Sequence, residues 1–180
     1  MKKLILTGVA SLIIATNTFA HTLKSIKEPT NPALNPLDTI ASKLSKENFF
    51  AANTYKVVKF KPEQKPYESL EDLYIRVLKS TLHRDFPITG DEDGYDLGVL
   101  DKNCSLKQVK ADIAEGISHN LDLDDYNKLT NAMMVALQAG MIIITGSGSG
   151  NNTYAYIVAA VDTKNQELVY LISSNFGSDE

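Results

Sequence analysis

The chain has 180 residues, of which 43% are hydrophobic and 22% are charged, a balance typical of one ordinary globular domain. This composition excludes wholesale disorder, a collagen-like or coiled-coil structure, and a membrane protein with several spans. The 18 Lys and Arg residues are outnumbered by 22 Asp and Glu residues, so the net charge is −4, which disfavours nucleic acid and anionic lipid as partners.

The N-terminus has the layout of a secretory signal peptide. A short basic start precedes residues 4–15, which are apolar, and the small residues Thr18 and Ala20 precede the expected cleavage site. This apolar run is short for a bilayer span, which takes about 20 residues, although an uncleaved anchor helix is the alternative. No cysteine for lipid attachment lies near the cleavage site. We therefore expect residues 1–20 to be removed and the mature bacterial protein to be periplasmic, or alternatively secreted, without membrane insertion.

Residues 21–36 contain three of the six prolines, which fix φ and lack a backbone donor. We therefore predict a Pro-rich extended tether in which no regular element forms. A single globular domain is expected over residues 37–180. It starts with a helix over residues 37–50, because Asn35 suits an N-cap and Pro36 suits the first helical position.

The middle of the chain combines regular elements with one acidic segment. β-branched and aromatic residues predict a strand over residues 54–60, and an apolar stripe capped by Ser69 predicts a helix over residues 69–83. Residues 85–101 carry six Asp and Glu side chains and no Lys or Arg. Their charge equals the net −6 that remains once the leader and its two lysines are removed. Three glycines accompany these acids, so we predict a surface loop.

The last part of the chain contains helices followed by strands. Ser105 begins a helix that ends before Asn120, and another helix begins after Asp122 or Asp124 and ends before Gly140. Three strands are predicted over residues 141–145, 153–161 and 167–173, joined by a flexible glycine-rich loop at 146–152 and a turn at 162–166. Short connections indicate an antiparallel meander. We therefore predict an α+β fold, with about four helices packed on a C-terminal three-stranded antiparallel meander and room for one extra N-terminal strand.

The acidic segment is the first candidate site. The carboxylates expected to bind a partner are Asp91, Glu92, Asp93 and Asp96, and they suit a basic protein surface. Calcium bound by Asp91, Asp93 and Asp96 is the alternative, because hard oxygen ligands suit this ion. A standard EF-hand is excluded, since the positions of its first and last ligands hold no carboxylate. A solvated acidic face is the simplest interpretation.

The glycine-rich segment 146–152 is the second candidate. A phosphate-binding loop needs a helix after its glycines, whereas a strand is predicted here, so a nucleotide site is disfavoured. Gly148 and Asn151 are instead expected to contact a protein partner from the tip of a hairpin.

Cys104 is the only cysteine, and a buried structural thiol is the ordinary interpretation. It also lies at a predicted helix start, a position that stabilises thiolates. The three C-terminal strands contain no histidine that would act as a base, so His119 is the candidate by tertiary approach. A small cysteine-type hydrolase of the cell envelope, with Cys104 and His119 as its catalytic residues, is therefore the alternative.

The sequence contains no catalytic constellation and no metal motif that these patterns identify. We therefore expect an exported binding or inhibitory protein rather than an enzyme, with no cofactor and with a protein partner. One version is an immunity protein that neutralises a secreted toxin by protein–protein contact, because such a function lies in surface shape and charge. The alternatives are the cell-envelope hydrolase and an exported effector.

Overall fold

The computed structural model describes residues 24–40, 51–61, 63–85, 94–114, 122–150 and 153–176. The strands within these ranges are β1 (Lys24–Ile26), β2 (Ala51–Lys59), β3 (Tyr95–Val99), β4 (Ile142–Gly150), β5 (Thr153–Asp162) and β6 (Glu167–Phe176). The helices are the 3-10 helix η1 (Pro32–Leu34), a helical stretch over 35–40, α2 (Leu70–Asp85), α3 (Leu106–Ala114) and α4 (Leu123–Gln138). The fold is therefore α+β, as predicted.

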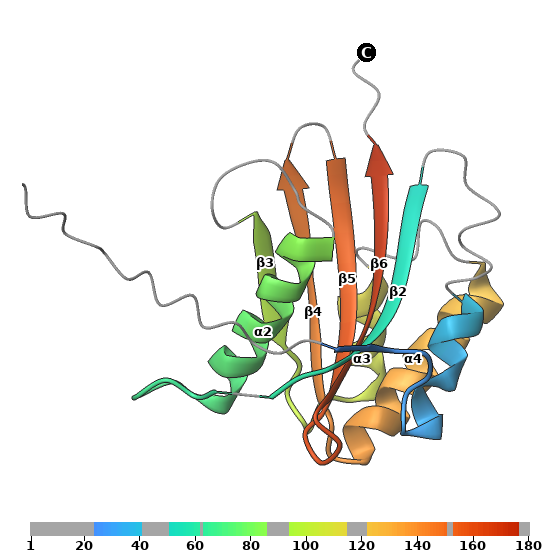
Figure 1. Ribbon diagram of the computed structural model, residues 1–180. Coiled ribbons are helices and arrows are strands. Elements are labelled where there is room, and N and C mark those ends of the chain that lie inside the picture. Colours follow the sequence, from blue (N-terminus) through green and yellow to red (C-terminus); the bar gives the residue numbers. More distant parts are fainter. Residues whose placement is uncertain are drawn as a thin grey trace, which may run out of the picture.

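The strands form one antiparallel sheet in the order β1-β2-β6-β5-β4-β3 (Figure 1). Its centre is the predicted meander, because β4, β5 and β6 are neighbours in both sequence and space. β2 pairs with β6 on one side, and β3 pairs with β4 on the other. The predicted count of three strands plus one is too low, because the described part of the chain contributes six. The additional strands, β1 and β3, come from segments that were predicted to lack regular structure.

Helices cover both faces of the sheet. η1, α3 and α4 pack on one face, and α2 packs on the other (Figure 1). The central strands β5 and β6 are consequently buried on both faces over residues 157–161 and 168–172, which explains why each appears in the sequence as a nearly continuous apolar run. No helix in the part of the chain that the structure describes combines the length and the apolar character that a membrane span requires.

Three helix starts follow from the predicted capping residues, whereas the predicted cap Asn35 is wrong because it lies within the helical stretch 35–40, and Asn31 caps η1 instead. Ser69 Oγ accepts a hydrogen bond from the Asp72 N–H at 3.0 Å, and Ser105 and Asp122 cap the next two helices in the same manner. Gly140 follows α4 with φ of 82°, a conformation that glycine adopts without the steric cost of a Cβ atom. Local sequence signals therefore determine where these helices begin and end.

The segment 21–36 is not an extended tether in the part that the structure describes. β1 pairs with β2, and η1 places Leu34 in the core with 0% exposure. The buried carboxylate of Glu167 accepts hydrogen bonds from the Thr30 N–H at 2.7 Å and from the Thr30 hydroxyl at 2.5 Å. Pro32 is compatible with this arrangement because proline suits the first position of a helical turn. Contacts to distant residues therefore order a segment whose own composition favours irregular structure.

Two further predictions of irregular structure are wrong in part. Residues 95–99 of the acidic segment form β3, and residues 146–150 of the glycine-rich segment continue β4. The rest of both segments, residues 86–93 and 151–152, lies outside the described residues.

Candidate functional site

Strand β3 forms one edge of the sheet, where β4 is its neighbour. The side chains that pack toward the α2 core are Tyr95, Leu97 and Val99, and those exposed to solvent are Asp96 and Gly98. We call this strand the β3 edge. Its register places Asp96 opposite Ser147 and Tyr95 opposite Gly148. The structure thus brings together Asp96 and Gly148, the two predicted contact residues that it describes.

Gly148 itself is buried, whereas Ser147 and Ser149 on either side of it are exposed. The prediction that Gly148 lies in a flexible tip is therefore wrong, because this residue lies within β4 opposite the buried Tyr95, and its contact with a partner stays a prediction. The serines face solvent instead, and Ser149 lies opposite Tyr154 of β5, which is 57% exposed. The exposed residues that share this face of the sheet are Asp96, Ser147, Ser149 and Tyr154, and we call them the β3–β5 surface.

Gly146 allows β3 to approach β4 closely. A Cβ atom at this position would lie 2.0 Å from the Asp96 carbonyl oxygen and 2.9 Å from Leu97 Cα. Real Cβ atoms do not approach backbone atoms so closely, so glycine is required for this strand pairing. Residues 146–150 therefore continue β4 rather than forming a flexible loop, and at Gly146 the neighbouring strand occupies the space that a side chain would need.

At Leu97 and Val99, the backbone of the β3 edge carries hydrogen-bonding groups that pair with no strand among the described residues. The Leu100 N–H donates a hydrogen bond to the Ile143 carbonyl oxygen at 2.9 Å. Because bonded and non-bonded pairs alternate in an antiparallel ladder, this bond shows that the even-numbered residues of β3 direct their N–H and C=O groups toward β4. Leu97 and Val99 direct their N–H and C=O groups away from the sheet, and no partner for these groups occurs within the described ranges.

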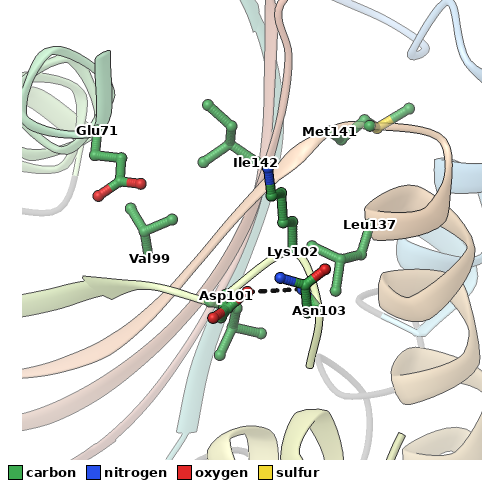
Figure 2. A pocket seen from close by; sticks show the side chains of 10 residues that line it. Glu71, Val99, Asp101, Lys102, Asn103, Leu137, Met141 and Ile142 are labelled. Carbon is green, nitrogen blue, oxygen red and sulfur yellow. Dashed lines mark hydrogen bonds between the residues drawn. The ribbon is translucent and has the colours of Figure 1, made fainter. Parts of the chain in front are cut away.

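A pocket of about 590 Å³ lies at the end of the β3 edge, next to Val99 (Figure 2). Its walls come from the first turn of α2, the segment after β3, and the connection between α4 and β4. The lining residues are Glu71, Val99, Leu100, Asp101, Lys102, Asn103, Leu137, Gly140, Met141 and Ile142. We call this cavity the β3 pocket, and it combines an apolar wall with four polar side chains.

The charges around the β3 pocket favour a cation. Glu71 and Asp101 outnumber the single ammonium of Lys102. The C-terminal end of α4 also reaches this pocket and has no basic residue in its last turn, so the partial negative charge of the helix end adds to the carboxylates. Asp101 is fixed in place because its carboxylate accepts a hydrogen bond from the Asn103 N–H at 2.7 Å (Figure 2).

Several residues predicted for partner or metal binding lie outside the described residues, namely Asp91, Glu92, Asp93 and Asn151. Their roles stay predictions. In the described ranges, no three His, Cys, Asp or Glu side chains come together in a way that could hold a metal ion. Asp96 is the one member of the predicted calcium set that the structure places, and it lies within β3 rather than in a loop.

Cys104 is half-buried just before α3 and packs against the core on the α3 and α4 face. His83 lies on the opposite face, where its ring packs edge-on against Tyr95 with centroids 5.8 Å apart. The sheet therefore separates His83 from Cys104. Burial raises the pKa of Tyr95 to about 12, so the phenol stays neutral beside His83. His119 lies outside the described residues, and its pairing with Cys104 stays a prediction.

Sequence reasoning missed the backbone groups of Leu97 and Val99 and the whole of the β3 pocket. One signal for the edge was present, because apolar residues alternate with Asp96 and Gly98 in the period of a strand. The surrounding acids and glycines concealed this pattern by favouring a loop. No local signal indicates the pocket, since its walls come from three separate parts of the chain.

Comparison of the sequence with protein-family models and with curated proteins finds no match.

Proposed function

We propose that this protein is an exported binding or inhibitory protein that contacts a basic protein partner through the β3–β5 surface. An immunity protein that neutralises a secreted toxin is one version of this function. The observation that carries the proposal is the pairing of β3 with β4, which holds the exposed Asp96 beside Ser147 at the last strand of the described sheet. A rigid sheet presents these groups in one fixed geometry, as recognition of a large partner requires.

The composition of the surface supports binding to a protein. Tyr154 is an exposed aromatic side chain with a polar tip, the type of residue that most often contributes strongly to protein–protein interfaces. Asp96 contributes negative charge, and the sequence around it, residues 85–101, contains no compensating Lys or Arg. A partner with a basic surface would therefore associate faster than a neutral one, because complementary charge steers the encounter.

The predicted signal peptide, residues 1–20, supports a location in the periplasm or outside the cell. A basic start, a short apolar stretch and small residues before the expected cleavage site direct a bacterial chain to the periplasm or beyond. Intact-mass measurement of the exported form should find His21 as the first residue. A chain that retains Met1 in the membrane fraction would contradict export with cleavage.

The test of the binding function uses the purified mature chain to capture proteins from the cell envelope and the culture medium. Each captured protein is then purified and its binding to variants is measured. Asp96→Asn should slow association roughly two- to fivefold, as expected for one exposed charge. Tyr154→Ala should weaken the affinity by at least about tenfold if Tyr154 anchors the contact. Glu28→Gln is the matched control, because Glu28 is exposed near β1 at the opposite edge of the sheet.

The binding measurements on these variants either support or contradict the β3–β5 surface as the contact site. Support requires a basic partner whose association depends on Asp96, does not depend on Glu28, and weakens with added salt within the range set by charge screening. Equal association rates for the Asp96 and Glu28 variants, together with unchanged affinity for the Tyr154 variant, would contradict the β3–β5 surface as the contact site.

A further inference from the structure

We propose that the partner supplies an extended basic segment that adds to β3 as a further strand and places a lysine or arginine side chain in the β3 pocket. This inference rests on the proposed function, because it specifies how the basic partner is held. It assigns a role to the β3 pocket, which the proposed function alone does not use.

The backbone of β3 can accept a further strand. Leu97 and Val99 direct two N–H and two C=O groups outward from the edge, as the ladder with β4 requires. An added strand would satisfy these groups by main-chain hydrogen bonds, and such addition to an exposed edge is a recurrent mode of peptide recognition. The β3 edge therefore provides affinity that does not depend on the side chains of the partner.

Side chains along β3 supply selectivity. A strand beside β3 would place alternate side chains on the face that carries Asp96, where a basic residue would lie next to this carboxylate. Gly98 lies on the same face, and a Cβ atom built there meets nothing within 4 Å. This open space accommodates a long side chain from the added strand. Alternating basic residues therefore suit the edge.

The β3 pocket can hold a basic side chain of the added strand, because a strand that runs along β3 past Val99 reaches the opening of this pocket. The carboxylates of Glu71 and Asp101 and the C-terminal end of α4 attract a cation there. The apolar side chains of Leu137 and Met141 would pack against the aliphatic stem of that cation, as the stems of lysine and arginine commonly do.

A second copy of the chain is the other candidate for an added strand, and its charge opposes this. The chain has a net charge of −4, and residues 85–101 contain six carboxylates without a basic residue. Two β3 edges side by side would bring the exposed Asp96 carboxylates of the two copies closer together, and like charges across paired strands are destabilising. The charge of the edge therefore favours a basic partner over a symmetric dimer.

The test uses the purified mature chain and a capped heptapeptide of alternating Lys and Val, Lys-Val-Lys-Val-Lys-Val-Lys, with a fluorescent label. The same peptide with Glu in place of Lys controls for charge, and Lys-Lys-Val-Val-Val-Lys-Lys controls for alternation. Two further peptides carry N-methyl groups on three alternate backbone amides, either on Lys residues or on Val residues. In an added strand one of these sets faces β3 and the other faces away, so the two peptides separate strand addition from attraction by charge alone.

We expect one N-methylated set to weaken binding by about thirtyfold, because the two hydrogen bonds that the peptide donates to the Leu97 and Val99 carbonyl groups, of about 1 kcal/mol each, are lost. The other set should change the affinity less than about threefold. Glu71→Gln should weaken binding of the unmodified peptide roughly two- to fivefold, whereas Glu28→Gln should not. The variant Val99→Pro gives a second measurement: the N–H that it removes points outward, so the ladder with β4 keeps its hydrogen bonds while the added strand loses one. Because it also changes a side chain that packs toward the α2 core, Val99→Ala is the matched control, which changes that side chain and keeps the N–H.

The outcomes distinguish this inference from the proposed function. If both N-methylated peptides bind equally, or if the unmodified peptide does not bind, strand addition is wrong. The proposed function still stands in that case if the captured natural partner depends on Asp96. A chain that is dimeric in solution and becomes monomeric with Val99→Pro would show that a second copy occupies the edge, which also overturns the inference.

Discussion

Gly146→Ala tests the close approach of β3 to β4, on which the candidate site depends. The new Cβ atom would lie 2.0 Å from the Asp96 carbonyl oxygen and 2.9 Å from Leu97 Cα. Both are backbone atoms, so relief of the clash requires a shift of β3 itself. Overpacking of this kind costs about 1–3 kcal/mol, and each β3–β4 hydrogen bond that breaks adds about 1 kcal/mol. We expect the free energy of unfolding to fall by about 2–4 kcal/mol.

Urea unfolding followed by circular dichroism measures this change, since the chain has no Trp for fluorescence. Gly98→Ala is the matched control, because Gly98 lies in the same strand pair and a Cβ atom there meets nothing within 4 Å. Its effect should stay within about 0.5 kcal/mol. A flexible loop at 146–152 would give the opposite sign, because Gly→Ala in a loop that alanine tolerates stabilises by about 0.4–1 kcal/mol. Equal stability of the two variants would refute the close-approach reasoning.

Three further predictions concern other parts of the fold. Thr30→Val removes a hydroxyl donor from the buried Glu167 carboxylate and should lower the free energy of unfolding by about 1–3 kcal/mol; an unchanged urea midpoint would show that this contact does not hold the N-terminal segment. Hydrogen bonding to Arg76 lowers the pKa of Glu68 to about 2, so this pair stabilises the fold above pH 4.5 and loses its effect as the pH falls through 2. Glu68→Gln should therefore reduce the fall in Tm over that range, and identical acid profiles would contradict this. Cys104→Ala should cost about 1 kcal/mol of stability and leave partner affinity unchanged, whereas loss of a measurable hydrolytic activity would favour the cysteine-type hydrolase.

The sequence predicts the centre of the fold because the relevant signals there are local. The runs at residues 157–161 and 168–172 are apolar enough to be buried on both faces, and Ser69 and Gly140 mark helix ends by their own conformational preferences. Short turns between successive strands leave an antiparallel meander as the simple solution. These elements therefore appear in the structure close to where they were predicted.

The edges of the sheet could not be predicted in the same way. β3 and the outer half of β4 contain acids, glycines and serines, whose local preferences favour loops. They form strands because each supplies the other with a partner and because Gly146 removes the Cβ atom that would separate them. β1 is ordered by β2, which lies far along the chain. Pairing between distant segments thus overrides local propensity at both edges.

The candidate site depended on these same long-range contacts. Asp96 was predicted as a contact residue from its charge, but its place in an edge strand beside Ser147 follows only from the β3–β4 register. Gly148 was predicted from its presumed mobility and is buried instead. The acidic composition of residues 85–101 was therefore enough to single out Asp96. The outward-facing N–H and C=O groups of Leu97 and Val99 could be recognised only once the pairing of β3 with β4 was known.

The most direct test of partner binding at the β3 edge is amide hydrogen exchange, measured residue by residue on the mature chain with and without its captured partner. The N–H groups of Leu97 and Val99 point outward and should exchange rapidly in the free protein. The N–H of Gly98 faces β4 and serves as an internal reference in the same strand. We predict that the partner slows exchange at Leu97 and Val99 well beyond any change at Gly98. Unchanged exchange at both residues, with new protection elsewhere on the surface, would contradict binding at this edge.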